Sequence, residues 1–231
     1  LATAPEAHAE ATPIRVGDGT AAGASMTATI SSALTGTGGL AKTDLGTLVL
    51  SGFNAYAGDT TISAGTLKFD VDLGGTLGAP TGALAIAGGA TFDLTGTSQT
   101  VGALSGAGSI TSSVFGGRQS PLTVNQATNT SFSGAITDGY MTGAGDGAVW
   151  LIKDGAGTLT LSGNSAFSFT TVDGGTLAIA NGGTVANETS NLGNAAGSNG
   201  TVLVTGSGSV WSTDYLYLGY AGAGTLTVAD G

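Results

Sequence analysis

The sequence contains no cysteine, which excludes disulfide bonds and thiolate metal sites. Its only histidine, His8, lies in an alanine-rich stretch at the start of the chain. The rest of the chain therefore has no histidine from which a Ser-His-Asp triad or a histidine zinc site could be built. Neither a G-x-S-x-G motif nor a phosphate-binding P-loop occurs. These absences predict that the protein is not an enzyme and that it binds no cofactor and no metal ion.

Charge is also scarce in this chain. Only 9% of the 231 residues are charged, and the net charge is −10. The fixed positive charges are Arg15, Lys42, Lys68, Arg118 and Lys153. Nucleic acids and anionic membrane surfaces both require clustered basic residues, so neither is an expected partner. No apolar run reaches the roughly 18 residues that a transmembrane helix needs.

Glycine, in contrast, is abundant at 43 residues, and it separates short apolar runs. It lacks the three-residue period of collagen, and a hydrophobic content of 41% is too high for a disordered linker. The runs between glycines are too short for helices and are typical of strands. The run from Thr66 to Leu73 alternates, which predicts a strand with one buried and one wet face. Its apolar set is Leu67, Phe69, Val71 and Leu73, and its polar set is Lys68, Asp70 and Asp72.

One segment of the sequence occurs twice. The stretch from Gly39 to Leu67 returns, loosened, from Val149 to Leu177, with Lys42 recurring as Lys153. A unit copied along a chain indicates a solenoid, a propeller or an array, because a single unit cannot bury its own apolar face. We therefore expect stacked coils with threonine and asparagine ladders along the stack. The leucines expected to face inward are Leu48, Leu67, Leu159, Leu177 and Leu226.

The chain divides into two expected regions. Residues 1–20 are interpreted as a leader and N-terminal cap region, and Ala7-His8-Ala9 within it has the small-x-small shape of a signal-peptidase site. Residues 21–231 are interpreted as the repeat array, which we expect to be truncated at its C-terminal end. Three stretches interrupt the strand pattern and are expected to be loops. They are Ser113 to Pro121, Tyr140 to Gly147 and Asn181 to Gly200.

Aromatic residues near the C-terminus form a candidate binding surface. Tyr215 and Tyr217 alternate with Leu216 and Leu218, so the tyrosines are exposed if the leucines face inward. Exposed tyrosine and tryptophan are enriched at recognition sites. The alternative is that these aromatic side chains only cover the edge of a coil. The full candidate surface comprises Trp211, Tyr215, Tyr217 and Tyr220 with the loop residues Arg118, Tyr140 and Asp146.

Two groups of acidic residues could in principle serve catalysis or calcium binding. Lys68, Asp70 and Asp72 on one strand face are the best case for an enzyme, but the neighbouring repeats add no further acids or arginines, which favours a solvated face. The segment Gly143 to Leu151 resembles a calcium-binding nonapeptide only faintly. It occurs once and its acid is misplaced, which favours a surface turn.

The repeated motif resembles a known family. The segment Gly39 to Leu67 is similar to the passenger-associated strand repeat of bacterial autotransporters, and Leu94 to Ile110 resembles the coil that accompanies it. Gly206 to Val228 resembles another repeat of the same proteins. The resemblance implies an all-β fold, a right-handed parallel β-helix (β-solenoid). It also implies transport to the outer surface of a Gram-negative cell by a C-terminal membrane barrel, which this sequence does not contain.

Two functions fit this resemblance. The first is an adhesin that attaches to a host surface protein, to matrix or a glycan, or to itself, either at the cell surface or after release from it. The second is a structural spacer that displays a distal domain, and a polysaccharide-cleaving enzyme is less favoured than either. The three expected loops favour the adhesin, because loops are where binding functions are commonly placed. Contact with a membrane is expected only through the barrel.

Overall fold

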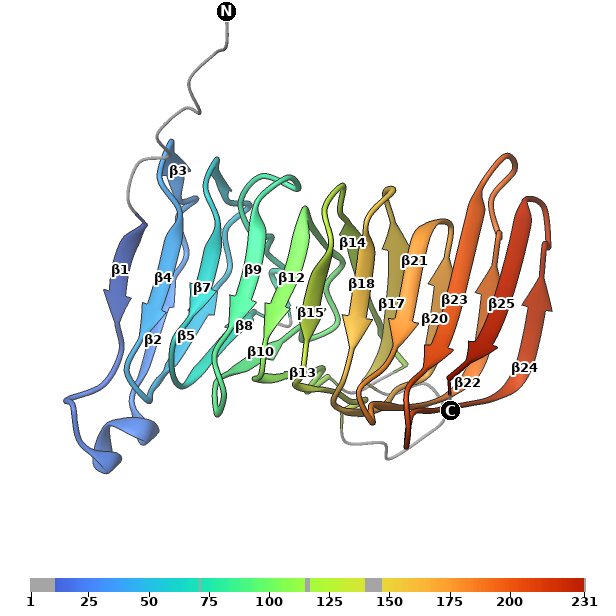
Figure 1. The fold of residues 1–231 in the computed structure, drawn as a ribbon. Coiled ribbons are helices and arrows are strands. Elements are labelled where there is room, and N and C mark those ends of the chain that lie inside the picture. Colours follow the sequence, from blue (N-terminus) through green and yellow to red (C-terminus); the bar gives the residue numbers. More distant parts are fainter. Residues whose placement is uncertain (1–10, 71, 115–116, 140–146, 231) are drawn as a thin grey trace, which may run out of the picture.

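The computed structural model describes residues 11–70, 72–114, 117–139 and 147–230. The chain winds as a stack of coils, with β1 at one end and β24 and β25 at the other (Figure 1). Neighbouring strands within its sheets run parallel and lie in register from coil to coil. The predicted all-β parallel β-helix is therefore confirmed. Right-handed winding is the general rule for such crossovers.

The longest sheet has ten strands, one from each of ten successive turns of the chain. Its strands, in order along the stack, are β1 (Thr12–Arg15), β4 (Leu40–Thr43), β7 (Thr60–Ile62), β9 (Ala83–Ile86), β12 (Ala103–Gly106), β15 (Thr130–Phe132), β18 (Thr158–Leu161), β21 (Gly174–Ile179), β23 (Asn199–Thr205) and β25 (Ala223–Ala229).

Two further sheets share the rest of the coil. A six-stranded sheet covers the N-terminal half and contains β2 (Thr27–Ile30), β5 (Thr47–Leu50), β8 (Thr66–Phe69), β10 (Thr91–Asp93), β13 (Ser109–Thr111) and β16 (Ala135–Ile136). A seven-stranded sheet covers the C-terminal half and contains β11 (Gln99–Val101), β14 (Gln119–Asn125), β17 (Ala148–Asp154), β20 (Phe169–Val172), β22 (Thr184–Leu192), β19 (Asn164–Ala166) and β24 (Val210–Leu218). The pair β3 (Thr35–Gly36) and β6 (Ala55–Tyr56) and the short 3-10 helix η1 (Ala21–Ser25) complete the described elements.

The core follows from the two-residue period of each strand. Leu48 of β5 stacks in register on Leu67 of β8, and Leu67 stacks on Phe92 of β10, so that one apolar column fills the interior along the stack. All three side chains are fully buried, as are Leu159 and Leu177. Leu226, the remaining leucine expected to face inward, pairs in register with the buried Val202 but is 37% exposed, because β25 is the last strand of its sheet.

On the outer side of the six-stranded sheet, the predicted threonine ladder is present. Thr27, Thr47, Thr66 and Thr91 occupy equivalent positions on successive strands. The asparagines Asn54 and Asn187 instead lie buried at corners of the coil. The side-chain amide of Asn54 donates to the carbonyl oxygens of Gly52 and Thr76 and accepts from the backbone N–H of Leu34. Hydrogen bonds of these buried amides join neighbouring coils, and Asn187 makes its contacts from within β22.

A lysine stands in the interior of each repeat copy. Lys42 is fully buried in the column formed with Ile14 and Ile62. Its Nζ donates to the carbonyl oxygens of Thr43, Asp44 and Ala64 at 3.0, 2.6 and 3.0 Å. The ammonium therefore satisfies carbonyls that belong to two consecutive coils.

Lys153 repeats this arrangement in the second copy. It is fully buried, and its Nζ donates to the carbonyl oxygens of Asp154, Gly155 and Gly174 at 2.7, 2.8 and 3.0 Å. Burial lowers the pKa of Lys153 to about 8, although the charge of Asp154 opposes this shift. The pKa of Lys42 is lowered by burial for the same reason.

The predicted strand from Thr66 to Leu73 is wrong beyond Phe69, where β8 ends. The Asp70 carboxylate accepts hydrogen bonds from the backbone N–H groups of Asp72 and Leu73 at 2.9 and 3.0 Å, which folds the chain into a turn. Leu73 is consequently exposed rather than inward-facing. Val71 lies outside the described residues.

Strands extend into two of the predicted loops, over three residues of the first and over much of the second. β14 begins at Gln119, inside the expected loop from Ser113 to Pro121, and β22 and the start of β23 occupy much of the expected loop from Asn181 to Gly200. The sequence does not show the alternating apolar pattern of a strand here, because polar residues occupy inward positions. Ser120 is buried against Ser112, with their hydroxyl oxygens 2.6 Å apart. The third expected loop, apart from Gly147, lies outside the described residues.

Candidate binding surface

Trp211 does not belong to an exposed patch. It pairs in register with the buried Val185, so its side chain faces the interior side of β24 and packs against the core. Its indole Nε1 donates to the side-chain oxygen of Asn187 at 3.0 Å. For Trp211, the alternative that it covers the edge of a coil is the better description.

The tyrosines of β24 point to the outside. Tyr215 and Tyr217 are 64% and 46% exposed and pair with Thr189 and Asn191 of β22. Leu216 and Leu218 pair with the fully buried Ser190 and Leu192, which places them on the inner side. The predicted alternation is confirmed. Tyr220 follows the strand, is 73% exposed and meets the Tyr217 ring edge to face, with centroids 6.3 Å apart.

Tyr215 continues a column of residues that the sequence alone did not reveal. On the outer face of the seven-stranded sheet, one residue from each of five successive strands lies in register. We call this column the outer ladder, and its members are Pro121, Trp150, Phe169, Thr189 and Tyr215. The rings of Trp150 and Phe169 have centroids 4.6 Å apart and planes inclined by 55°. Neighbouring members of this column are 19 to 29 residues apart in the sequence, so only the register between the strands brings them together.

A second column runs beside the outer ladder, two residues further along each strand. We call it the flanking column, and its members are Thr123, Ile152, Thr171, Asn191 and Tyr217. All its members except Ile152 carry a hydroxyl or amide group, and neither column contains a charged residue. The two columns together form an uncharged face on this part of the β-helix.

Of the three loop residues in the candidate surface, the structure describes only Arg118. Arg118 is exposed and directly precedes β14, the strand that carries Pro121. Tyr140 and Asp146 lie outside the described residues. Whether any of the three contributes to binding therefore stays a prediction.

The acidic cluster predicted on β8 lines a groove of about 430 Å³ together with Thr95, Ser113 and Val114. Beneath it, the buried Asp93 accepts hydrogen bonds from the backbone N–H groups of Thr95 and Ser113 at 3.0 and 2.8 Å. The backbone N–H groups of Leu73 and Asp72 lower the pKa of Asp70. Asp70 is thus an ionised turn-forming residue, and this role gives it no proton to donate near neutral pH. Within the described ranges, no group of three or more His, Asp or Glu residues could hold a metal ion.

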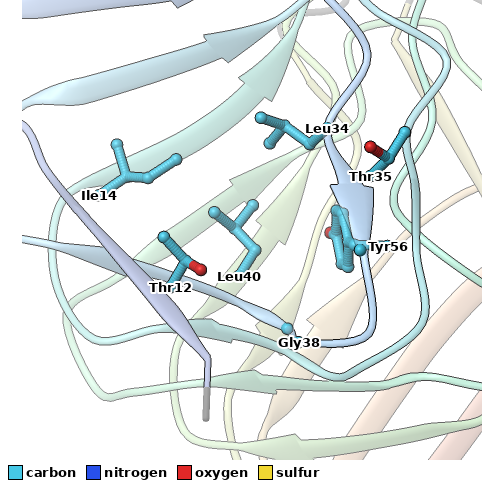
Figure 2. Close-up of a pocket in the computed structure, with 9 residues that line it drawn as sticks. Thr12, Ile14, Leu34, Thr35, Gly38, Leu40 and Tyr56 are labelled. Atoms are coloured by element: carbon cyan, nitrogen blue, oxygen red, sulfur yellow. The ribbon is translucent and has the colours of Figure 1, made fainter. Parts of the chain in front are cut away.

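A second pocket of about 250 Å³ lies beside β1 (Figure 2). Ile14, Leu34, Leu40 and Tyr56 line it together with Thr12, Thr35 and glycines. The phenol oxygen of Tyr56 lies 2.6 Å from the hydroxyl of Thr60, and burial raises the pKa of Tyr56, so this group stays neutral. The lining is suited to a small apolar group rather than to catalysis.

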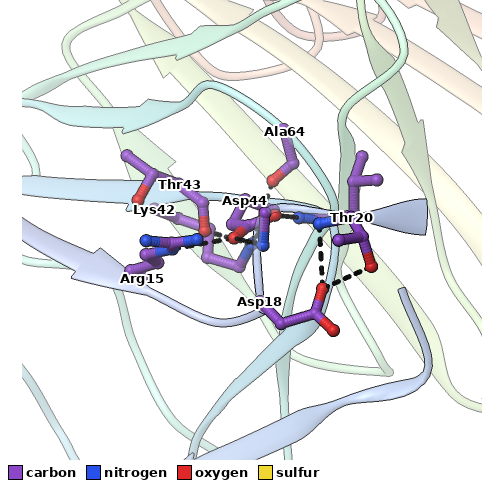
Figure 3. A network of polar contacts seen from close by, with 9 residues as sticks. Arg15, Asp18, Thr20, Lys42, Thr43, Asp44 and Ala64 are labelled. Atoms are coloured by element: carbon purple, nitrogen blue, oxygen red, sulfur yellow. Dashed lines mark hydrogen bonds and ion pairs between the residues drawn. The ribbon is translucent and has the colours of Figure 1, made fainter. Parts of the chain in front are cut away.

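A polar network lies close to η1 (Figure 3). Arg15 Nε donates to Asp44 Oδ2 at 2.8 Å, and the same oxygen accepts the backbone N–H of Gly19 at 2.9 Å. Asp18 accepts from both the backbone N–H and the hydroxyl of Thr20. The Arg15 hydrogen bond is the main cause of the lowered pKa of Asp44. Since Asp44 ties β1 and the turn before η1 to the next coil, and Asp18 shapes that turn, we assign the network a structural role.

Among the described residues, no helix has the length and apolar character needed to cross a membrane. The family model of the passenger-associated-transport-repeat matches residues 40–69 and 151–179, the two copies of the repeated segment. The chain is also similar to a protein of Brucella suis biovar 1 (strain 1330) called "Adhesin BmaC autotransporter". The identity is 36% over 213 residues, which cover 88% of this chain and 6% of that relative. This chain thus spans only a small part of the relative's length. No solved structure matches it.

Proposed function

We propose that this chain acts as an adhesive segment at the bacterial surface. The chain is a stretch of an autotransporter passenger built from passenger-associated-transport repeats. The observation that carries the proposal is the pair of uncharged columns on the outer face of the seven-stranded sheet, which ends in the exposed Tyr215 and Tyr217. Aromatic enrichment and depletion of charge are typical of the central part of a binding interface.

The adhesive surface would serve attachment to host cells or matrix, or contact between bacteria. The Brucella relative is called an adhesin, which supports this class of activity. This chain would be located at the cell surface and outer membrane, or in the medium after release. With a net charge of −10, this protein repels acidic surfaces at long range, so contact depends on hydrogen bonds and aromatic packing.

The spacer hypothesis draws support from the regular stacking of the coils. The expected loops give the adhesin less support than the sequence suggested, because β22 occupies much of one of them and β14 takes the last three residues of another. The outward-facing aromatic residues distinguish the adhesin hypothesis from the spacer hypothesis. A spacer has no need of exposed tyrosines on an uncharged face, whereas a binding surface uses them. The role of Asp70 in a turn offers no support to the enzyme hypothesis.

The proposal is tested by displaying the chain on a non-adherent bacterium and counting the cells that attach to host cells, matrix proteins and each other. We expect the displayed chain to increase attachment to at least one of these surfaces, and the double substitution Tyr215→Ser and Tyr217→Ser to remove this increase. Phe53→Ser is the matched control, because Phe53 is a 72% exposed aromatic residue outside the seven-stranded sheet. Display without attachment to any surface would favour the spacer.

A further inference from the structure

We infer that the outer ladder is the docking face for a linear, uncharged glycan that lies along the axis of the β-helix. This inference rests on the proposed adhesive function and names the chemical class of its partner. It is carried by three features of the described residues: the spacing of the ladder, the polar groups beside it and the distribution of charge around it.

The spacing of the ladder matches a polymer rather than a compact ligand. The strands β14, β17, β20, β22 and β24 follow one another along the stack (Figure 1), and each contributes one residue to the ladder. Neighbouring rungs are therefore separated by the strand spacing of about 4.8 Å. A β-linked hexose unit has a comparable length, so successive sugars can meet successive rungs. The apolar faces of sugar rings pack well on Trp150, Phe169 and Tyr215.

The flanking column supplies hydrogen-bonding groups on four of its five strands, with Ile152 as the exception. Thr123, Thr171 and Asn191 present hydroxyl and amide groups beside the ladder, and Tyr217 adds a phenol. Within the part of the chain that the structure describes, the buried indole N–H of Trp150 has no hydrogen-bond partner. Because the surrounding protein covers this nitrogen, it does not serve as a contact for a ligand on the outer face.

Charge selects an uncharged glycan among possible polymers. Acidic residues border the two columns on both sides. Asp154 ends β17 and Asp173 follows β20 on one side, and Glu188 and Asp214 precede Thr189 and Tyr215 on the other. Sialylated, uronic or sulfated chains would be repelled by these carboxylates. A second copy of this protein would bring its own net charge of −10 to the same face.

The inference is tested on the purified chain with neutral oligosaccharides, namely cellohexaose, chitohexaose, laminarihexaose and mannohexaose, and with their trimers. Calorimetric titration should show binding of at least one hexamer and at least about tenfold weaker binding of its trimer, because fewer rungs are covered. Trp150→Ala and Tyr215→Ala should each weaken hexamer binding by about tenfold. Tyr215→Ala also keeps the test valid if Trp150→Ala fails to fold, since Tyr215 is exposed. Phe53→Ser should bind like the unchanged chain.

Three results would overturn the inference. The first is that no neutral hexamer binds, the second is tighter binding of a sulfated or sialylated chain, and the third is a dimer in sedimentation experiments that Tyr215→Ala abolishes. The two proposals fail separately. If displayed chains still attach bacteria through Tyr215 and Tyr217 while no neutral glycan binds, the adhesive function stands and only its partner is wrong. If hexamers bind but displayed chains do not attach bacteria to any surface, the adhesive function fails.

Discussion

At the residue scale, the buried lysines are the least expected feature of the core. Each ammonium replaces its water shell with three carbonyl oxygens drawn from two coils. A buried charge is tolerated only when it is well hydrogen-bonded. The repeat thus carries its lysine as a link between the turns of consecutive coils rather than as a surface charge.

We predict that Lys153→Met lowers the free energy of unfolding by about 2–4 kcal/mol, because its three carbonyl oxygens lose a charged donor inside the core. The measurement is urea unfolding followed by circular dichroism. Lys68→Met is the matched control, since Lys68 lies on the outer face of β8 and should change stability by less than about 0.5 kcal/mol. Equal or greater stability of the Lys153→Met variant would contradict the role given to this ammonium.

The pH dependence of stability tests the same site. The pKa of Lys153 is lowered from 10.5 to about 8 in the folded chain, so the folded state releases this proton at a lower pH than the unfolded state does. Between these two values the unfolded state binds more protons, and stability rises with pH. We therefore predict that the melting temperature of the unchanged chain increases relative to Lys153→Met from pH 7.5 to about 10. A relative decrease would mean that the carbonyl oxygens hold the proton more strongly than burial removes it.

The sequence predicts part of this residue-scale picture. The recurrence of Lys42 as Lys153 is visible in the repeat, and so is the inward direction of Leu48 and Leu159. The burial of the lysines is not, because a lysine in an alternating pattern is normally exposed and only the folded turn shows the three carbonyls that surround it. The inward direction of Trp211 was missed for a similar reason, since its partner Asn187 lies 24 residues away.

At the element scale, glycine sets how closely successive coils approach at their corners. A Cβ atom at Gly102 would collide with the carbonyl oxygen of Thr81 in the preceding coil, whereas a Cβ at Gly88 would have Ala107 as its nearest neighbour, 3.9 Å away. Both glycines lie at turns, but only Gly102 is in tight contact with another coil. Glycine is thus a packing requirement at some turns and replaceable at others.

We predict that Gly102→Ala destabilises the chain by about 2 kcal/mol or more, because the coil backbones must move apart. Gly88→Ala should be neutral within about 0.5 kcal/mol or slightly stabilising, since the added methyl group makes only ordinary van der Waals contact with Ala107 and reduces the freedom of the unfolded chain. Thermal unfolding of the two variants provides the comparison. Equal effects of both substitutions would show that the corner at Gly102 adjusts more easily than its contacts indicate.

Strand positions were predictable where inward residues are apolar and glycine marks the boundaries. β5 and β18 fall within the repeated segment as expected. The prediction failed where side chains take over the role of apolar contacts or of backbone turns. In β22, the buried side-chain amide of Asn187 donates to the hydroxyl of Ser190, so two inward positions are polar and the alternation is lost. At Asp70, a carboxylate turn ends a strand whose apolar pattern continues.

At the scale of the whole molecule, register creates the candidate surface. The tyrosines of β24 were recognisable from the sequence because they alternate with leucines within one strand. Trp150 and Phe169 belong to other coils, and only the parallel pairing of β17 with β20 brings their rings together. A β-helix thus converts residues spaced one coil apart into a continuous line, which is the geometry required for an extended partner.

The central claim is that attachment depends on the uncharged outer face, and the most direct test measures it at high ionic strength. Bacteria that display the chain are allowed to attach in about 0.15 M and about 0.5 M salt, where charge interactions are increasingly screened. The account predicts that attachment persists in the higher salt and that Tyr215→Ser with Tyr217→Ser removes it at both concentrations. Attachment that disappears at about 0.5 M salt, or that survives the loss of both tyrosines, would contradict it.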